Sequence, residues 1–138
     1  PMKITVETTV RAPVEDAWRA WTDPDAICHW NAATDAWHCP SAELDLRPGG
    51  RFSYRMEARD GSTRFDYAGH FTRVIPHERL ESVLDDERTV QVEFLRNGDD
   101  ASVIVRETFD TISDESADRE RIGWQAILDR FARHVGGG

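Results

Sequence analysis

The stretch that decides the fold is residues 117–135, ADRERIGWQAILDRFARHV. At 100° per residue its apolar side chains fall on one stripe, made of Trp124, Ile127, Leu128, Phe131 and Val135. This spacing predicts one long amphipathic helix. A single helix with so apolar a face needs a sheet to bury it, and nearly all of the chain before it has the pattern of strands. Sheet and helix could close on each other fully or leave a cavity between them.

The composition is that of one globular domain. The chain has 138 residues, which we expect to form a single domain over 1–138 with 136–138 as a disordered tail. The net charge of −9 disfavours nucleic acid as a partner, because phosphate binding needs a basic surface. No apolar run approaches the roughly 18 residues of a membrane span, and the first residues lack the features of a signal peptide. A cytoplasmic location is therefore expected.

The first part of the chain predicts one strand and two short helices. Residues 3–10 alternate between apolar and polar side chains, which indicates a half-buried strand. Pro13 suits the first position of a helix, and a second helix holding Ile27 and Trp30 follows the break at residues 22–24. Residues 31–41, NAATDAWHCPS, show no period and are interpreted as a loop.

Apolar alternation then predicts about six strands before the long helix. Asp60-Gly61 and Asn97-Gly98 are typical of tight hairpin turns. Consecutive hairpins make an antiparallel sheet, and no alternation of strands with helices exists that would build a parallel dinucleotide-binding sheet. The predicted class is α+β, in the order strand, two short helices, about six strands, long helix.

Six short motifs narrow this architecture further. They are AWRAWTDP at 17–24, HW at 29–30, DLRPGGRF at 45–52, DG at 60–61, IPHERL at 75–80, and GW followed by Leu at 123–128. In this order they resemble the helix-grip fold of the START-like (SRPBCC, Bet v 1-like) superfamily. Within it they resemble the AHSA1-like family, the homologues of the C-terminal domain of the Hsp90 ATPase activator. The resemblance covers essentially the whole chain.

The resemblance implies a curved antiparallel sheet that grips the C-terminal helix over a cavity. In related branches the cavity holds hydrophobic or amphipathic small molecules, and no cofactor is implied. The family name suggests an Hsp90-type chaperone as a partner. The eukaryotic activator, however, makes much of its Hsp90 contact through an additional N-terminal domain, which we do not expect within these 138 residues.

An aromatic-rich set is expected to converge between sheet and helix. A filled core is the alternative to a cavity, but buried Tyr and Trp side chains need partners for their polar atoms, and a cavity holding water or ligand supplies these more easily. The predicted ligand-binding residues are Trp30, Trp37, His38, Phe52, Tyr54, Met56, Phe65, Tyr67, Phe71, Glu107, Trp124 and Leu128.

Glu107 is the strongest single candidate for a functional residue. It shares the strand parity of Val105 and Phe109, so its carboxyl group falls on an apolar face. It could pair with an arginine, be protonated, touch a polar ligand, or lean out to solvent at the strand end. If it lies inside, desolvation should raise its pKa and make it a candidate acid or base. Glu107 and His38 are the catalytic candidates, with Tyr67 as an alternative partner.

Two mirrored pairs, Cys28-His29 and His38-Cys39, contain zinc-type ligands. Their spacing matches none of the usual zinc patterns, because adjacent residues reach one ion poorly, so no metal is expected. A Cys28–Cys39 disulfide and a Cys–His nucleophile remain open as minor alternatives. The preferred interpretation is structural, with the loop 31–41 closing one end of the cavity and Trp30, Trp37 and His38 at its rim.

Three functions remain open. The favoured hypothesis is a binding protein for a hydrophobic or amphipathic small molecule. The alternatives are a cyclase, dehydratase or hydrolase that uses the same cavity, and a cochaperone-like interaction module. No GxSxG, GxxxxGK or HExxH motif is present in the sequence. A homodimer is also open.

Overall fold

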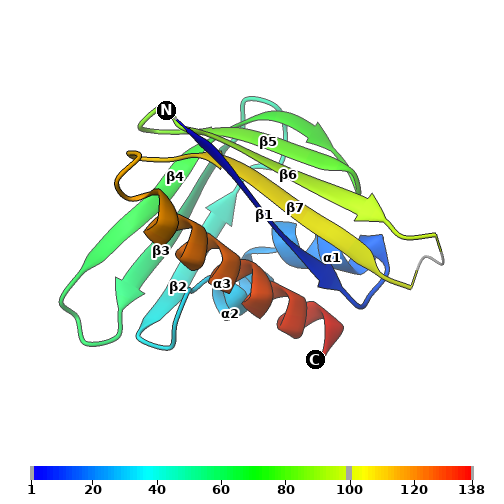
Figure 1. Ribbon diagram of the computed structural model, residues 1–138, viewed down its shortest axis with the longest axis horizontal. Coiled ribbons are helices and arrows are strands. Elements are labelled where there is room, and N and C mark those ends of the chain that lie inside the picture. The colour runs from blue at the N-terminus through cyan, green and yellow to red at the C-terminus, as the bar shows by residue number, and fades with distance from the viewer. Residues whose placement is uncertain (1, 99–100, 138) are drawn as a thin grey trace.

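The computed structural model describes residues 2–98 and 101–137. In this part of the chain seven strands form one antiparallel sheet, in the order β1-β7-β6-β5-β4-β3-β2. The sheet curls around one side of α3, and α1 and α2 lie beside the C-terminal half of α3 (Figure 1). The elements are β1 (Lys3–Val10), α1 (Val14–Thr22), α2 (Pro24–Trp30), β2 (Trp37–Leu44), β3 (Arg51–Ala58), β4 (Arg64–Ile75), β5 (Arg79–Leu84), β6 (Thr89–Arg96), β7 (Val103–Asp110) and α3 (Ala117–Gly136). The predicted α+β order is confirmed.

The alternation of apolar and polar residues along each strand determines which side chains lie on the inner face of the sheet. In β7 every second residue is buried, beginning with Val103. The register places Glu107 opposite Val6 of β1 and Val92 of β6. Side chains directly opposite one another lie on the same face, so Glu107 sits in a row with two buried valines. The carboxyl group is thereby fixed on the concave side.

Helix α3 closes the fold over only part of its length. It packs on β1 and touches α1 and α2. Near its C-terminal end, Phe131 meets the rings of Trp21 and Trp30, each with a centroid separation of 4.9 Å. Towards its N-terminal end, Trp124 and Ile127 are only partly buried. Of the helices in residues 2–98 and 101–137, none is both long and apolar enough to cross a membrane.

The predicted loop at 31–41 is wrong in its second half. β2 begins at Trp37, which pairs with Ala58 of β3. The register shifts between His38 and Ser41, and Pro40 lacks the N–H that a regular ladder uses. This bulge at the edge of the sheet interrupts the alternation, which explains why the sequence pattern concealed the strand.

The glycines at the C-terminal end complete α3. Gly136 is the last helical residue, and Gly137 follows in the left-handed conformation with φ of 69°. Its N–H donates to the carbonyl of Arg133 at 2.9 Å. This is a typical glycine helix terminus. A disordered tail is expected at 136–138 from the sequence. Gly136 and Gly137 instead form the end of α3, and Gly138 lies outside the described residues.

Candidate functional site

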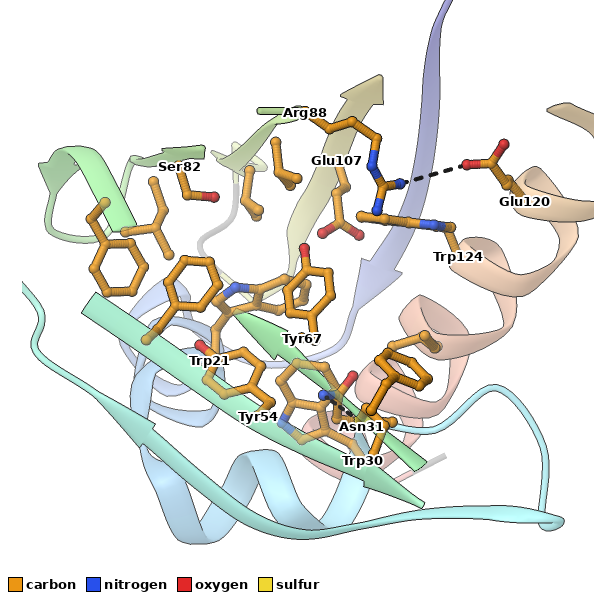
Figure 2. Close-up of a pocket in the computed structure, with 18 of the residues that line it drawn as sticks. Trp21, Trp30, Asn31, Tyr54, Tyr67, Ser82, Arg88, Glu107, Glu120 and Trp124 are labelled. Carbon is orange, nitrogen blue, oxygen red and sulfur yellow. Dashed lines mark hydrogen bonds and ion pairs between the residues drawn. The ribbon is translucent and has the colours of Figure 1, made fainter. Parts of the chain in front are cut away.

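A cavity of about 320 Å³ lies between the inner face of the sheet and α3 (Figure 2). Small-molecule sites typically measure about 300–1,000 Å³ and combine apolar walls with a few polar groups. The wall contains nine of the predicted ligand-binding residues: Trp30, Phe52, Tyr54, Met56, Phe65, Tyr67, Phe71, Glu107 and Trp124. The interior is therefore not packed solid, although the sequence allowed that alternative.

Three predicted residues do not line this cavity. Trp37 packs edge-on against Phe65, with ring centroids 5.8 Å apart, so it supports the wall from behind. His38 lies 3.7 Å from the Glu57 carboxylate on a half-exposed part of β2. Leu128 is fully buried in the core.

Glu107 is the central polar group of the wall. Its side chain is 6% exposed and projects from β7 into the cavity (Figure 2). Within the described part of the chain, its carboxyl oxygens form neither a hydrogen bond nor an ion pair. Burial raises the pKa of Glu107 to about 8, because desolvation penalises the charged form. At neutral pH the Glu107 carboxyl group is therefore mainly protonated.

Two tyrosines face Glu107 from the opposite side of the curled sheet. Tyr54 and Tyr67 are cross-strand partners on β3 and β4, and their rings stack with centroids 6.0 Å apart. The Tyr67 hydroxyl points towards Glu107 (Figure 2). Burial, reinforced by the nearby Glu107, raises the pKa of Tyr67 well above its usual value. Burial, and to a smaller extent the nearby Cys39 and Glu107, also raises the pKa of Tyr54. Both phenols are thus neutral donors and acceptors.

The charged end of the wall is built by the β5–β6 turn and the start of α3. Arg88 Nε donates to Asp86 at 2.8 Å, and its guanidinium lies 3.8 Å from the Glu120 carboxylate. Glu120 also accepts the Ile112 N–H at 3.1 Å and the Ser116 hydroxyl at 2.6 Å. These contacts tie the first turn of α3 to the sheet. The arginine and Glu120 are consequently paired with each other before any ligand arrives.

The opening of the cavity is marked by exposed apolar residues in its wall. Phe65, near the start of β4, is 48% exposed, and Ile112, between β7 and α3, is 69% exposed. Apolar side chains at such a rim suit the entry of an apolar molecule. Sequence reasoning missed Arg88 and Ile112 because both lie in connections without any hydrophobic period.

Gly69 in β4 and Gly123 in α3 differ in what a side chain at each position would meet. A Cβ on Gly69 would collide with the carbonyl oxygen of Val83 on β5, so Gly69 serves the close approach of two strands. A Cβ on Gly123 would meet nothing within 4 Å. Close packing therefore explains Gly69 and does not explain Gly123.

The two thiols lie beside each other, but the two histidines contact different groups. Both thiols are free. Burial, followed by the neighbouring Cys28 thiol, raises the pKa of Cys39 to about 12, which makes it a poor nucleophile. His29 stacks on His134, with centroids 5.8 Å apart, whereas His38 lies beside Glu57. The described residues contain no group of three or more ligands suited to a metal ion.

A curved antiparallel sheet that holds a C-terminal helix over an internal cavity defines a helix-grip domain. The family model "Activator of Hsp90 ATPase homolog 1-like protein" matches residues 11–136, and the chain belongs to this family. The solution structure of the AHSA1-like protein from Aeromonas hydrophila is 43% identical, with a TM-score of 0.90 over 99% of this chain and 93% of that one.

Two further solved structures share the architecture. Chr148 from Cytophaga hutchinsonii is 36% identical, with a TM-score of 0.84 over 98% of this chain and 92% of that one. CalU16 from Micromonospora echinospora is 23% identical, with a TM-score of 0.70 over 98% of this chain and 74% of that one, a likeness that shows the fold alone. Comparison with curated proteins gave no match.

Proposed function

We propose that this chain binds a hydrophobic or amphipathic small molecule in the cavity between the sheet and α3. The proposal rests on polar atoms that point into an aromatic cavity and have no hydrogen-bond partner among the described residues. The foremost of them are the oxygens of the Glu107 carboxyl group. A buried polar group without a hydrogen bond costs on the order of 1–3 kcal/mol. A bound molecule with one polar end removes that cost and buries its own apolar surface.

The wall is suited to an amphipathic molecule, because it combines a large apolar surface with a few polar groups. Phe52, Phe71 and Leu80 contribute apolar wall from β3, β4 and β5. The rings of Phe52 and Phe71 lie 4.9 Å apart, which gives one part of the cavity a continuous aromatic surface. The polar part is formed by Glu107 and Tyr67. The proposed ligand therefore has an apolar body and a single polar group.

Titration with the neutral fluorescent dye N-phenyl-1-naphthylamine tests this function. Its fluorescence should rise on binding to the wild-type protein. Ile127→Trp adds volume to the cavity wall and should weaken dye binding about tenfold or more. Ile122→Trp is the matched control, because it makes the same change on the same helix at a side chain that is 70% exposed and outside the wall. Equal binding by both variants, or no binding by wild type, would contradict the proposal.

Acid–base catalysis in the same cavity is a second candidate, favoured by the pKa of Glu107. Burial raises that pKa to about 8, and efficient proton transfer needs a pKa near the working pH. The model substrate 5-nitrobenzisoxazole opens its ring when a base removes its carbon-bound proton, as the N–O bond breaks to give a cyanophenolate. Catalysis that appears as pH rises through 8 and disappears in Glu107→Gln would support this candidate. Equal rates for the two proteins would reject it.

A cochaperone-like function rests on the family description alone. The exposed large apolar side chains among the described residues come from separate segments: Met2, Leu46, Phe65, Ile112 and Ile122. Two of them, Phe65 and Ile112, belong to the cavity wall. The Hsp90-type partner and the cytoplasmic location stay predictions.

A further inference from the structure

The charges around the cavity leave Glu107 without a positive counterpart. The titratable wall residues of the described chain are Tyr54, Tyr67, Arg88, Glu107 and Glu120. The tyrosines are neutral, and Arg88, the single cation in this set, is shared between Asp86 and Glu120. Two carboxylates thus already pair with this one guanidinium group. A further positive charge is what this arrangement lacks.

The surroundings of Glu107 are suited to a cation. The carboxyl group lies between the Tyr67 hydroxyl and the Trp124 indole (Figure 2), and those two rings meet edge-on with centroids 6.2 Å apart. Aromatic faces attract organic cations through their quadrupoles, most strongly where water is excluded. The nearby phenol adds a neutral oxygen that accepts a hydrogen bond from an N–H group.

We infer that the ligand of this cavity is an organic amine with an aromatic or otherwise apolar body, whose ammonium group binds the Glu107 carboxylate. This inference rests on the proposed binding function and adds the chemical class of the ligand. The ammonium donates hydrogen bonds to Glu107 and Tyr67, and the apolar body lies along Phe52 and Phe71. An anionic head group would instead face Glu107 and Glu120, with Arg88 already paired.

Amine binding moves a proton in a defined direction. Before an amine binds, Glu107 is mainly protonated at pH 7, because its pKa is about 8. An alkylamine carries its own proton up to about pH 10, so formation of the ion pair sends the Glu107 proton to solvent. Affinity for the amine should therefore increase from pH 6 to pH 9. A ligand carbonyl that accepts from protonated Glu107 shows the opposite trend.

Three probes with one indole body and different head groups separate these chemistries. Tryptamine carries an ammonium, tryptophol a neutral hydroxyl, and indole-3-acetate a carboxylate. Each is used to displace N-phenyl-1-naphthylamine from the wild-type protein. Tryptamine should bind about tenfold or more tightly than tryptophol, since charge-assisted hydrogen bonds are the stronger ones. Calorimetry in two buffers of different ionisation enthalpy should show proton release.

Two variants complete the experiment. Glu107→Gln keeps the shape of the side chain and should remove the preference for tryptamine, so that tryptamine and tryptophol displace the dye to within about twofold of each other. Tyr67→Phe should weaken tryptamine by a smaller factor and serves if Glu107→Gln fails to fold. Dye binding with equal or weaker displacement by tryptamine than by tryptophol or indole-3-acetate overturns the amine inference alone. Absence of dye binding overturns the proposed function as well.

Discussion

The indole ring of Trp124 lies flat on the phenyl ring of Phe109, with centroids 3.9 Å apart and planes 11° from parallel. This stack joins α3 to β7. Because the ring lies along the sheet, it forms a wall of the cavity instead of crossing it. The apolar stripe of the helix therefore performs two tasks, since Leu128 and Phe131 complete the core while Trp124 and Ile127 border the cavity.

Trp124→Ala should lower the free energy of unfolding by about 3 kcal/mol, because it removes the aromatic stack and enlarges an existing cavity. Urea denaturation followed by circular dichroism measures the change. Ile122→Ala, at an exposed position on the same helix, should stay within about 0.5 kcal/mol of wild type. A loss below about 1 kcal/mol for Trp124→Ala would mean that the stack does not anchor α3.

Glu107 should make the stability of the protein fall as pH rises. Its folded pKa of about 8 lies above its ordinary value of 4.5, so the folded state binds the extra proton between these values. This contribution is fully present below pH 4.5 and is lost as pH rises through 8. Its full size is on the order of 5 kcal/mol, because the folded and ordinary pKa values lie about 3.5 apart.

Glu107→Gln removes this dependence. The variant and wild type should have similar melting temperatures near pH 4.5, and the variant should melt several degrees higher at pH 9. Thermal unfolding of both proteins across this range provides the comparison. The same difference in melting temperature at every pH would show that the carboxyl group is not desolvated in the folded state.

Asp110 should stabilise the protein above its unfolded pKa. Burial acts to raise the pKa of Asp110, but hydrogen bonds from Lys3 and from the backbone and hydroxyl of Thr89 outweigh it and lower the pKa to about 2. The stabilisation is present above pH 3.8 and is lost as pH falls through 2. Asp110→Asn should cost about 1–2 kcal/mol at pH 7 and almost nothing at pH 2.

Lys3→Met is the matched control for this prediction. Lys3 is 61% exposed on its side chain, so solvent screens its ion pair, and Thr89 continues to bind Asp110 in the variant. The cost should be below about 1 kcal/mol. Equal losses for Lys3→Met and Asp110→Asn would assign the whole effect to the ion pair.

Thr111→Val should stabilise the protein by about 1 kcal/mol. Thr111 is 2% exposed, and its hydroxyl oxygen has no hydrogen-bond partner among the described residues. Valine keeps the shape and removes the unsatisfied group. Thr108→Val is the control, because its hydroxyl bonds Thr5 at 3.0 Å on the exposed face. A melting temperature of Thr111→Val below that of wild type would indicate a partner for the hydroxyl in solution.

The elements with a clear hydrophobic period were predictable. The strands around Val6, Tyr54 and Val105 and the stripe of α3 followed their patterns, because each element buries one face. Trp37 and Cys39 belong to β2 although the pattern predicted a loop, since Pro40 and the adjacent bulge break the alternation.

The site was predictable where it depends on strand parity and not where it depends on turns. Parity placed Glu107 on the inner face, and the structure buries it there. Arg88 lies in a turn, where no period indicates direction, so its position beside Glu120 could not be foreseen. Whether these residues bind a ligand stays a prediction.

The sequence by itself determined the α+β order, the antiparallel sheet and the carboxyl group on its apolar face, because periodicity and turn residues act locally. Only the tertiary structure decided that a cavity remains. Its volume depends on the curvature of the sheet and on the Trp124–Phe109 stack, which holds the indole against β7. Such contacts join residues distant in sequence, and no local pattern encodes the separation of sheet and helix.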